Sequence, residues 1–483
     1  MQYGTDRIRK DLIWYIAGAF MPMAVLLLRS PIFTRVFSPE EYGQYTLVYL
    51  IFLYLSALKL EWIRTSIWRY YLKYKKRGII KQFHHAVSAF FLVSAASILL
   101  VTAIWFFLTP NYEIKLLILF GAANLLTQEL ITILMITHRI EGRSGFYNIV
   151  NSTRTAGGFL LLLVLAFGLD FGISAFFLAP ALVNTIFLVF LLYRSSFTLI
   201  PDFSVITRND LKRFMNYGFA GTMTMLATFL LISSDRWIIH HFHGLDKTGI
   251  YNQTYMLGQM SIMAIITVLN AAFNPYLINN IEKRRQDTDT FVSNTFRWYF
   301  YIIFPMAVYI SLYAQQISIL LLGPEFREAW DIIPLVAFGF LLDGLCHFSS
   351  IKLKFFNRLR FLYSGVVIAT IINVLLNLYL IPRFNYTIAA YTTLLSYLVM
   401  FLFYYFSASS NYLHSKANRK FVLLIIAVMS VQVAMHIILK PHLPDFHPLI
   451  LAGAEFLLFA LLYFVVTYPL SPLKENTLVH EVP

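Results

Sequence analysis

The chain has 483 residues, of which 59% are hydrophobic and 13% are charged, and its mean hydropathy is +0.67. An ordinary soluble domain carries roughly 25% charged residues, so this composition excludes a soluble protein and indicates a polytopic membrane protein. The net charge of +14 does not indicate a nucleic-acid partner, because in a membrane protein the positions of basic residues report topology. Cys346 is the one cysteine in the sequence, which excludes an intrachain disulfide.

Apolar runs long enough to cross a bilayer, about 20 residues each, recur along the whole chain. The run after the polar segment Met1–Lys10 has no small-residue cleavage site, so we expect no cleavable signal peptide. The sequence predicts an all-α polytopic membrane protein with about 14 transmembrane helices. The predicted spans are Leu12–Phe33, Tyr42–Leu60, Ala86–Leu108, Tyr112–Ile136, Phe146–Gly168, Phe171–Tyr193, Phe214–Ile239, Ile250–Leu277, Trp298–Leu322, Ile332–Ile351, Phe361–Ile381, Tyr386–Ser407, Phe421–Leu439 and Phe446–Tyr468.

The basic residues divide unevenly between the two sides of these spans. Of the 38 Lys and Arg residues, 29 lie on the side of the N-terminus, in or beside alternate connections, and seven lie on the other side. The remaining two, Arg29 and Lys59, lie inside spans, as do Lys115, Arg154 and Arg236, which are counted here with the side nearer to each. Because cytoplasmic connections of membrane proteins are enriched in Lys and Arg, this alternation predicts that both termini are cytoplasmic.

Two stretches at the ends of predicted spans one and seven resemble each other. Phe33–Leu50 aligns with Ile239–Met256 at an offset of 206 residues, and the alignment pairs Gly43 with Gly249. In both stretches a long span ends in a short polar loop, and a Gly-x-Tyr sequence follows at the start of the next helix. A second correspondence, at an offset of 214 residues, pairs Glu129 in span four with Asp343 in span ten.

These correspondences predict two six-helix lobes that are related by a repeat. The lobes are residues 1–196 and 197–411, and residues 412–483 form an additional pair of transmembrane helices, 13 and 14, with a cytoplasmic tail. Two repeated halves with a site between them are typical of transporters. The duplication therefore favours a transport function.

Charged residues inside spans are costly in hydrocarbon and usually mark functional positions. Arg29 lies in the outer half of span one, and its repeat counterpart is Asp235, which Arg236 follows. If the two halves face each other, Arg29, Asp235 and Arg236 are candidates for a gate near the outer mouth. The alternative is that Arg29 extends to the interface and has no role in transport.

Lys59 and Arg64 occupy the inner end of span two, with Glu61 between them. An Arg offers bidentate donors and a Lys offers a compact charge, so a pocket formed by these side chains can hold a diphosphate. The alternative is a basic cluster that only sets topology. Arg29, Lys59, Arg64 and, in span five, Arg154 are the candidate substrate contacts.

A polar stripe marks one face of span five. Asn148, Asn151, Ser152 and Thr155 follow the spacing of a single helical face, and Arg154 lies beside them. Such a stripe suits the hydroxyl groups of a sugar along a cavity wall. Hydrogen bonding between helices would produce the same pattern, so both interpretations stay open.

Glu129 and Asp343 are single acids at matching places in spans four and ten. Either is a candidate site for H+ or Na+, by which an ion gradient would drive transport. The alternative for Glu129 is that it neutralises a nearby Lys or Arg. No other cofactor is expected, since the sequence contains no Gly-Lys pair and hence no nucleotide-binding Walker loop.

Four segments of the chain resemble motifs of a known family. PIFTRVFSPEEYGQYTLVY, SSDRWIIHHFHGLDKTGIYNQTYMLG, LLGPEFREAWDIIPLVAFG and NVLLNLYLIPRFNYTIAAYTTLLSY are similar to motifs of polysaccharide and oligosaccharide flippases in the multidrug/oligosaccharidyl-lipid/polysaccharide (MOP) exporter superfamily. The resemblance covers nearly the whole chain up to the final helix pair. Typical members have Gly-Ala-Ala where this chain has Ile388-Ala-Ala390, and Gly where it has Asn385.

The resemblance implies an O-antigen flippase-like transporter in a bacterial inner membrane. Its cargo would be an oligosaccharide linked to undecaprenyl diphosphate, and its partners, besides the lipid bilayer, would be polysaccharide polymerase or assembly proteins. Helices 13 and 14 would provide a groove for the lipid tail, by similarity to the lipid II flippases. A diphosphate and a sugar must cross about 30 Å of hydrocarbon, which a polar, cationic cavity opening alternately to each side would allow.

Two other classes of function remain as alternatives. A multidrug or small-cation exporter of the related MATE branch would favour an acidic cavity, whereas the charges inside the spans here are mixed or basic. A membrane-embedded polymerase or glycosyltransferase needs a substantial loop or domain, and the connections here are short. Asp287 and Asp289 form an Asp-x-Asp pair in a charged cytoplasmic loop, and His240, His241 and His243 lack the carboxylates that would complete a metal site. We therefore expect neither an enzyme nor a metal site.

Overall fold

The computed structural model describes residues 21–470, except residues 23, 26, 196, 283–287, 356–357, 409–415 and 440–447. All regular secondary structure in these residues is helical, which confirms the predicted all-α fold. The chain divides into two compact units, of which one ends at Gly249 and the other begins at Ile250. The predicted lobe boundaries at residues 196 and 411, the start of the first predicted span, Asp287 and the C-terminal tail lie outside the described residues.

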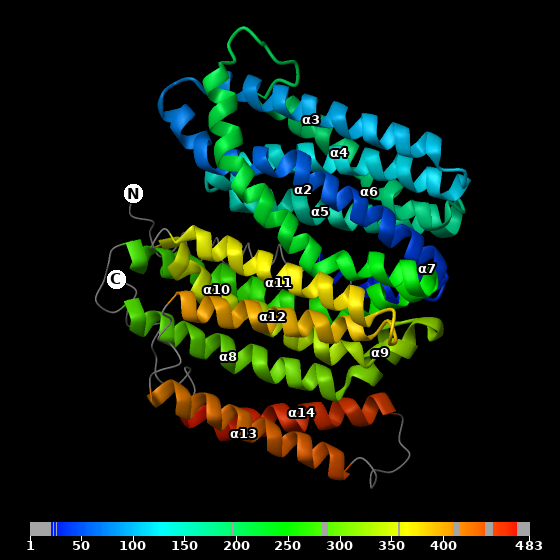
Figure 1. Ribbon diagram of the computed structural model, residues 1–483, viewed down its shortest axis with the longest axis vertical. Helices are drawn as coiled ribbons and strands as arrows, with labels where there is room; N and C mark the ends of the chain where they lie inside the picture. Colours follow the sequence, from blue (N-terminus) through cyan, green and yellow to red (C-terminus); the bar gives the residue numbers. More distant parts are fainter. Residues whose placement is uncertain are drawn as a thin grey trace. The chain divides into compact units, whose positions relative to one another are not determined.

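The unit before Ile250 is a bundle with α4 at its centre (Figure 1). α4 packs against α2, α3 and α6, and α5 packs against α6. A first helix, described only in part, ends at residue 33. The later elements are α2 (Pro39–Lys76), α3 (Ile80–Leu108), α4 (Tyr112–Ile140), α5 (Ser144–Leu163), a π-helical turn (Val164–Gly168), a 3-10 turn (Gly172–Ser174), α6 (Ala175–Arg194) and the first part of α7 (Arg208–Glu282).

α2 begins with local signals that the sequence states plainly. The Ser38 side chain accepts a hydrogen bond from the Glu41 backbone at 3.3 Å, and the Glu41 carboxylate accepts one from the Ser38 backbone at 2.8 Å. This reciprocal pair is a capping box, and Pro39 occupies the first turn, where its missing N–H costs nothing. The start of α2 is therefore set by its own sequence.

α7 combines the seventh and eighth predicted spans and breaks between them. Gly244 has φ 91° and ψ 179°, a conformation that only glycine adopts easily, and a second helical segment starts at Leu245. Because α2 starts at Pro39, 206 residues earlier, the two repeat-related segments start at equivalent positions.

These two helix starts lie in close contact. A Cβ on Gly43 would overlap the carbonyl oxygen of Leu245, and a Cβ on Gly249 would overlap that of Pro39. The repeat pairs Gly43 with Gly249 and Pro39 with Leu245, so the two contacts are equivalent, as two-fold symmetry would make them. It is closer than any residue with a side chain would allow.

The unit that begins at Ile250 is built around α10. α10 packs against α8, α11 and α12, and α11 packs against α12. α13 contacts α8, and it also contacts α14, beside which it lies in Figure 1. The elements are the second part of α7, α8 (Thr288–Leu312), α9 (Ala314–Leu321), a 3-10 turn (Pro324–Ala329), α10 (Ile332–Phe355), α11 (Leu359–Leu380), α12 (Ile388–Ser407), α13 (Lys416–Leu439), α14 (Pro448–Thr467) and a 3-10 turn (Tyr468–Leu470).

Buried hydrogen bonds attach α13 and α14 to α8. The Tyr309 hydroxyl of α8 donates to the side-chain oxygen of Gln432 in α13 at 2.9 Å, and the Gln432 nitrogen donates to the Phe459 carbonyl of α14 at 2.8 Å. The Tyr463 hydroxyl of α14 donates to the Tyr301 carbonyl of α8 at 2.8 Å. In an apolar medium such bonds replace the hydrophobic effect as a source of helix association.

The predicted count of 14 spans is supported only roughly. In the described part of the chain, 10 helices are long and apolar enough to cross a membrane, or 11 if the broken pair α8 and α9, bent by 74°, forms one span. α7 is one of these helices although it contains two predicted spans. The apolar segment Ala452–Thr467 of α14 is not among them because it is shorter than a typical span. The chain is a multi-pass membrane protein.

Candidate functional site

A charged cluster inside the first unit joins α2 to α4. Nη1 of Arg64 lies 2.8 Å and 2.9 Å from the two carboxylate oxygens of Glu129. Nε of Arg64 also donates to Glu61 at 2.9 Å, so one guanidinium contacts two carboxylates. Ser56 donates to Glu129 at 2.6 Å and Thr65 donates to Glu61 at 3.0 Å. The cluster carries one positive and two negative formal charges.

The cluster forms because of helix spacing and packing. Glu61 and Arg64 are three residues apart on α2 and so share a face. α4 packs against that helix and places Glu129 opposite. The side chain of Glu129 is 6% exposed and that of Arg64 is 17% exposed, so both charges are largely removed from solvent and their contact is strengthened by the low local dielectric constant.

The structure brings together two residues for which the sequence predicts different roles. Arg64 is a predicted substrate contact and Glu129 a predicted ion site, and their contact is the neutralisation that the sequence left open for Glu129. Lys59 is half-buried and forms no ion pair with the described residues. Sequence reasoning placed Glu61 beside Arg64 and gave it no role, although the three-residue spacing on a helix was the signal for this ion pair.

The polar stripe of α5 borders a small cavity. Asn148 is buried, and Asn151 accepts a hydrogen bond from Nη2 of Arg154 at 3.2 Å. Asn151 and Arg154 line a cavity of about 110 Å³ with Gln128 of α4. Nη1 of Arg154 is buried and has no hydrogen-bond partner among the described residues. The other stripe residue in the predicted set, Ser152, is half-buried.

Arg154 lies about ten residues after the start of α5, or roughly 15 Å along its axis, within the candidate span Gly145–Gly168. It is therefore near the middle of a hydrocarbon layer about 30 Å thick. Buried polar atoms are nearly always hydrogen-bonded. A guanidinium nitrogen without a partner at this depth thus marks a place for an acceptor.

Sequence reasoning missed a polar contact that extends this region to α6. The side-chain amide nitrogen of Asn184 donates to Asn124 at 3.2 Å and to Gln128 at 3.4 Å, both on α4. Asn124 and Gln128 lie one turn apart on α4 and Asn184 lies on α6, and the sequence alone does not distinguish such amides from packing contacts. Their common location becomes visible only when α4 and α6 are placed together.

The residues predicted to form a gate have different contacts in the structure. Nη2 of Arg29 donates to the Tyr45 hydroxyl at 3.2 Å, and its guanidinium carbon lies 3.9 Å from the ring centre of Phe176. No ion pair joins Arg29 to a carboxylate in the part of the chain that the structure describes. Asp235 and Arg236 are both buried and form an ion pair of 2.6 Å with each other. The gate role itself stays a prediction.

Asp343 differs from its repeat counterpart Glu129. It lies on α10, is half-buried, and forms no hydrogen bond or ion pair with the residues described here. Glu129 is instead held by Arg64 and Ser56. Since two acids paired by the repeat have different surroundings, their predicted role in ion coupling must be tested separately for each.

The fold is similar to that of solved proteins of the MOP superfamily. The structure is similar to the lipid II flippase MurJ in an inward closed conformation, with a TM-score of 0.71, 12% identity, and coverage of 94% of this chain and 98% of that chain. It is also similar to an inward-facing multidrug resistance MATE family transporter of the MOP superfamily, with a TM-score of 0.64, 14% identity, and coverage of 82% and 98%. At these identities the similarity shows the fold alone.

Residues 8–281 match the family described as "Polysaccharide biosynthesis protein", and the chain belongs to that family. An uncharacterised membrane protein of Methanocaldococcus jannaschii is 22% identical over 230 residues, which are 46% of this chain and 44% of that protein. The chain thus spans less than half the length of this curated relative. The family assignment confirms the resemblance seen in the sequence motifs.

Proposed function

We propose that the chain flips an undecaprenyl-diphosphate-linked oligosaccharide, such as an O-antigen or other surface polysaccharide repeat unit. The direction would be from the cytoplasmic to the outer leaflet of a bacterial inner membrane, by alternating access. The description of the family and the MOP fold support a flippase or transporter in general. The choice of an anionic, sugar-bearing cargo is supported by the polar residues inside the spans.

The observation that carries the proposal is the surroundings of Arg154. A charged side chain at the bilayer centre costs at least about 2.5–3.5 kcal/mol unless it is paired, and no carboxylate pairs with Arg154 among the described residues. A diphosphate would supply the missing acceptors in the bidentate geometry that guanidinium groups favour. Asn151 and Gln128, beside it in the cavity, offer amide groups to sugar hydroxyls.

Arg64 would contribute in a different way, because Glu61 and Glu129 already neutralise it. Protonation of Glu129 would remove one of the two carboxylate charges beside Arg64, and the Arg64 guanidinium could then donate to the substrate. Binding of H+, or of Na+ to the carboxylates, would in this way be coupled to binding of the cargo. This coupling is the form of ion-gradient drive that we propose for the transporter.

The test of the cargo uses a bacterial strain whose own flippase gene is deleted and replaced by this chain. We expect Arg154→Gln to abolish surface polysaccharide, Arg154→Lys to retain part of it, and Arg208→Gln, an exposed residue at the start of α7, to retain all of it. The measurement is the amount of surface polymer per amount of membrane-inserted protein. Full polymer in the Arg154→Gln strain at normal protein level would contradict the proposed role of this cavity.

The test of ion coupling uses proteoliposomes with an imposed gradient of H+ or Na+. We expect Glu129→Gln to remove the dependence of flipping on the gradient, and Asp343→Asn to do the same if the second acid also binds the ion. Glu113→Gln, at the exposed start of α4, is the matched control. Flipping that responds to neither gradient before and after substitution would exclude this mechanism.

A small-cation or multidrug exporter is the second candidate, and Asp343 is the observation that favours it. An acid without an ion-pair partner among the described residues suits a cationic substrate. The two candidate functions predict different effects of substitution. A cation exporter should lose cation export with Asp343→Asn, whereas a flippase should lose surface polymer with Arg154→Gln. Genes for glycosyltransferases and a polysaccharide polymerase beside this gene would support the first candidate and the proposed partners.

A further inference from the structure

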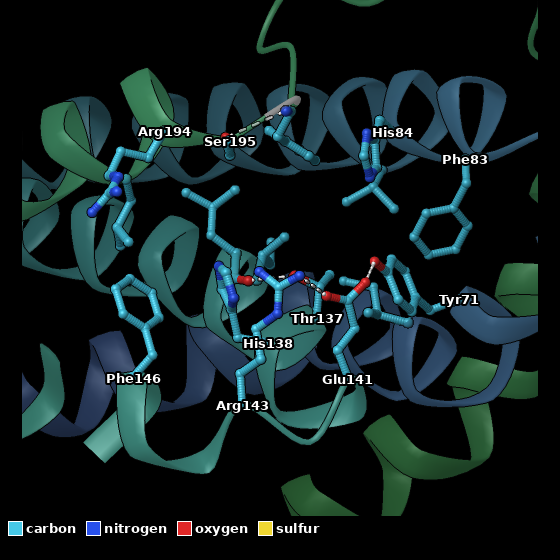
Figure 2. Close-up of a pocket in the computed structure, with 16 residues that line it drawn as sticks. Tyr71, Phe83, His84, Thr137, His138, Glu141, Arg143, Phe146, Arg194 and Ser195 are labelled. Atoms are coloured by element: carbon cyan, nitrogen blue, oxygen red, sulfur yellow. Dashed lines mark hydrogen bonds and ion pairs between the residues drawn. The ribbon is translucent and has the colours of Figure 1, made fainter. Parts of the chain in front are cut away.

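A cavity of about 540 Å³ lies within the first unit, at the helix ends on the side where basic residues collect (Figure 2). Its volume is within the range of about 300–1,000 Å³ that is typical of small-molecule sites. α2, α3, α4 and α6 and the turn between α4 and α5 all contribute to its wall. None of the residues that the sequence singles out for transport lines it.

The wall combines cationic and apolar surfaces. Arg143 and His138 project from the α4–α5 side, and Arg194 comes from the end of α6 on the other side (Figure 2). Apolar side chains from every contributing helix complete the wall. They are Ile67, Phe83, Val87, Ile133, Leu134, Phe146, Leu191 and Phe197.

Glu141 is the one carboxylate among the described residues of the wall, and it already has partners. Glu141 accepts hydrogen bonds from the Tyr71 hydroxyl at 2.6 Å and from Lys75, and it forms an ion pair of 3.2 Å with Arg143. Lys75 and Arg143 both pair with this carboxylate. Arg194 adds a further cation to the wall, so these four groups together carry a formal charge of +2 before the histidines are counted. The electrostatic potential of the cavity therefore favours an anion.

Two groups in the wall, the exposed guanidinium of Arg194 and the buried Nδ1 of His138, are placed to contact a bound anion. Arg194 pairs with no carboxylate among the described residues, and its guanidinium carbon lies 5.7 Å from the ring centre of Phe190. Nδ1 of His138 is buried and has no hydrogen-bond partner in the described part of the chain. A bound anion with several acceptor oxygens would satisfy both.

We propose that this cavity binds the phosphate of an amphiphilic anion, with the apolar part of the ligand against the hydrophobic wall. Arg143 and Arg194 hold the phosphate, because guanidinium groups match phosphate oxygens in bidentate geometry. Basic pockets between transmembrane helices at the cytoplasmic surface provide this chemistry for lipid headgroups. The site is separate from the Arg154 cavity and is not assigned to the transported cargo.

The experiment measures lipid binding to the purified full-length protein by native mass spectrometry in detergent. The probe is phosphatidylglycerol, with phosphatidylcholine, which carries no net charge, as the reference lipid. We expect the double variant Arg143→Gln, Arg194→Gln to bind phosphatidylglycerol at least tenfold more weakly than the unaltered protein. The matched control, Arg208→Gln with Lys212→Gln, removes two exposed charges on the same side and should bind normally.

A second variant tests the cavity without changing charge. Thr137→Phe places a larger side chain in the wall and should also weaken binding, whether or not the arginine variants fold well. Displacement of the lipid by millimolar inorganic phosphate would show that the site accepts phosphate from solution too, and no displacement would identify the leaflet as the source. Equal binding of phosphatidylcholine, normal binding by the double arginine variant, or an equal loss in the control would overturn the proposal. The measurement includes no transport step, so its result is independent of the proposed flippase function.

Discussion

Arg64 and Arg154 are both guanidinium groups inside candidate spans, but their surroundings give them different energetic roles. Arg64 contacts two carboxylates, whereas Arg154 contacts the amide of Asn151 and keeps one nitrogen without a hydrogen-bond partner among the described residues. Breaking a buried ion pair is costly because a charge is left without compensation. Loss of Arg64 should therefore affect stability first, and loss of Arg154 should affect binding first.

At this scale we predict the effect of neutralising Glu129. Glu129→Gln should lower the free energy of unfolding by about 2 kcal/mol, less than for a fully buried pair, because Glu61 still compensates Arg64. The double variant Glu129→Gln, Arg64→Gln should lose less than the sum of the single losses. Thermal unfolding in detergent measures both values, with Glu113→Gln as control. Strict additivity would show that the pair contributes nothing to stability.

We also predict a pH dependence that originates at Glu141, in the turn after α4. Burial raises the pKa of this carboxyl, but hydrogen bonds from Lys75 and Tyr71 outweigh burial, so its pKa lies below the ordinary value of 4.5. A carboxyl with a lowered pKa stabilises the folded state above the unfolded pKa, and this stabilisation is lost as the pH falls through the folded pKa. The melting temperature should drop below pH 4.5 in the unaltered protein and less so in Glu141→Gln. Identical profiles would contradict this assignment.

Among the elements, the starts of α2 and of the second segment of α7 are the pair that the fold constrains most closely. Both follow a short polar loop, and each places a glycine against the backbone of the other. Helices approach this closely only where a small residue removes the side chain. Close packing of the two helix starts thus explains why both positions that the repeat pairs are glycine.

We predict that Gly43→Ala destabilises the protein by about 1–3 kcal/mol, the usual cost of overpacking, although alanine favours helix formation. The control is Gly453→Ala in α14, where a Cβ would meet no atom within 4 Å. That change should be neutral or stabilise the helix by up to about 1 kcal/mol. Apparent melting temperatures compare the two variants. Equal melting temperatures would show that the two helix starts separate at no cost.

For the whole molecule, the predicted topology has both termini in the cytoplasm. Cys346 is buried and is the only cysteine, so Cys346→Ala provides a background for labelling. In that background Arg77→Cys, after α2, should react with a membrane-impermeant maleimide only in permeabilised cells. Asn111→Cys, before α4, should react in intact cells. The reverse pattern would invert the proposed orientation.

The repeat and the two compact units describe different aspects of the whole chain. The repeat predicts a boundary near residue 196, whereas the compact units meet at Gly249 and Ile250. The close contact of the two helix starts attaches Leu245 and Gly249 of α7 to α2. Earlier in α7, the Phe214 carbonyl accepts a hydrogen bond from Ser66 of α2 at 3.0 Å. Packing therefore groups this part of α7 with the helices that precede it.

The sequence by itself was enough to show that this protein lies in a membrane, that it is helical and which family it belongs to. Hydrophobic runs, caps such as Ser38 with Glu41, and motifs near Gly43 and Gly249 are local, so they can be read without coordinates. The same holds for the list of charges inside spans, because the cost of a charge in hydrocarbon does not depend on the fold.

Only the tertiary structure decided how those charges are used. It paired Arg64 with Glu129 across 65 positions of sequence. It left one donor of Arg154 without a partner among the described residues, and it placed Arg29 against Tyr45 and Phe176. It also formed the cavity between Arg143 and Arg194, neither of which lies inside a predicted span. The physical reason is that compensation of a charge depends on distance in space, and helix packing sets that distance between residues far apart in the chain.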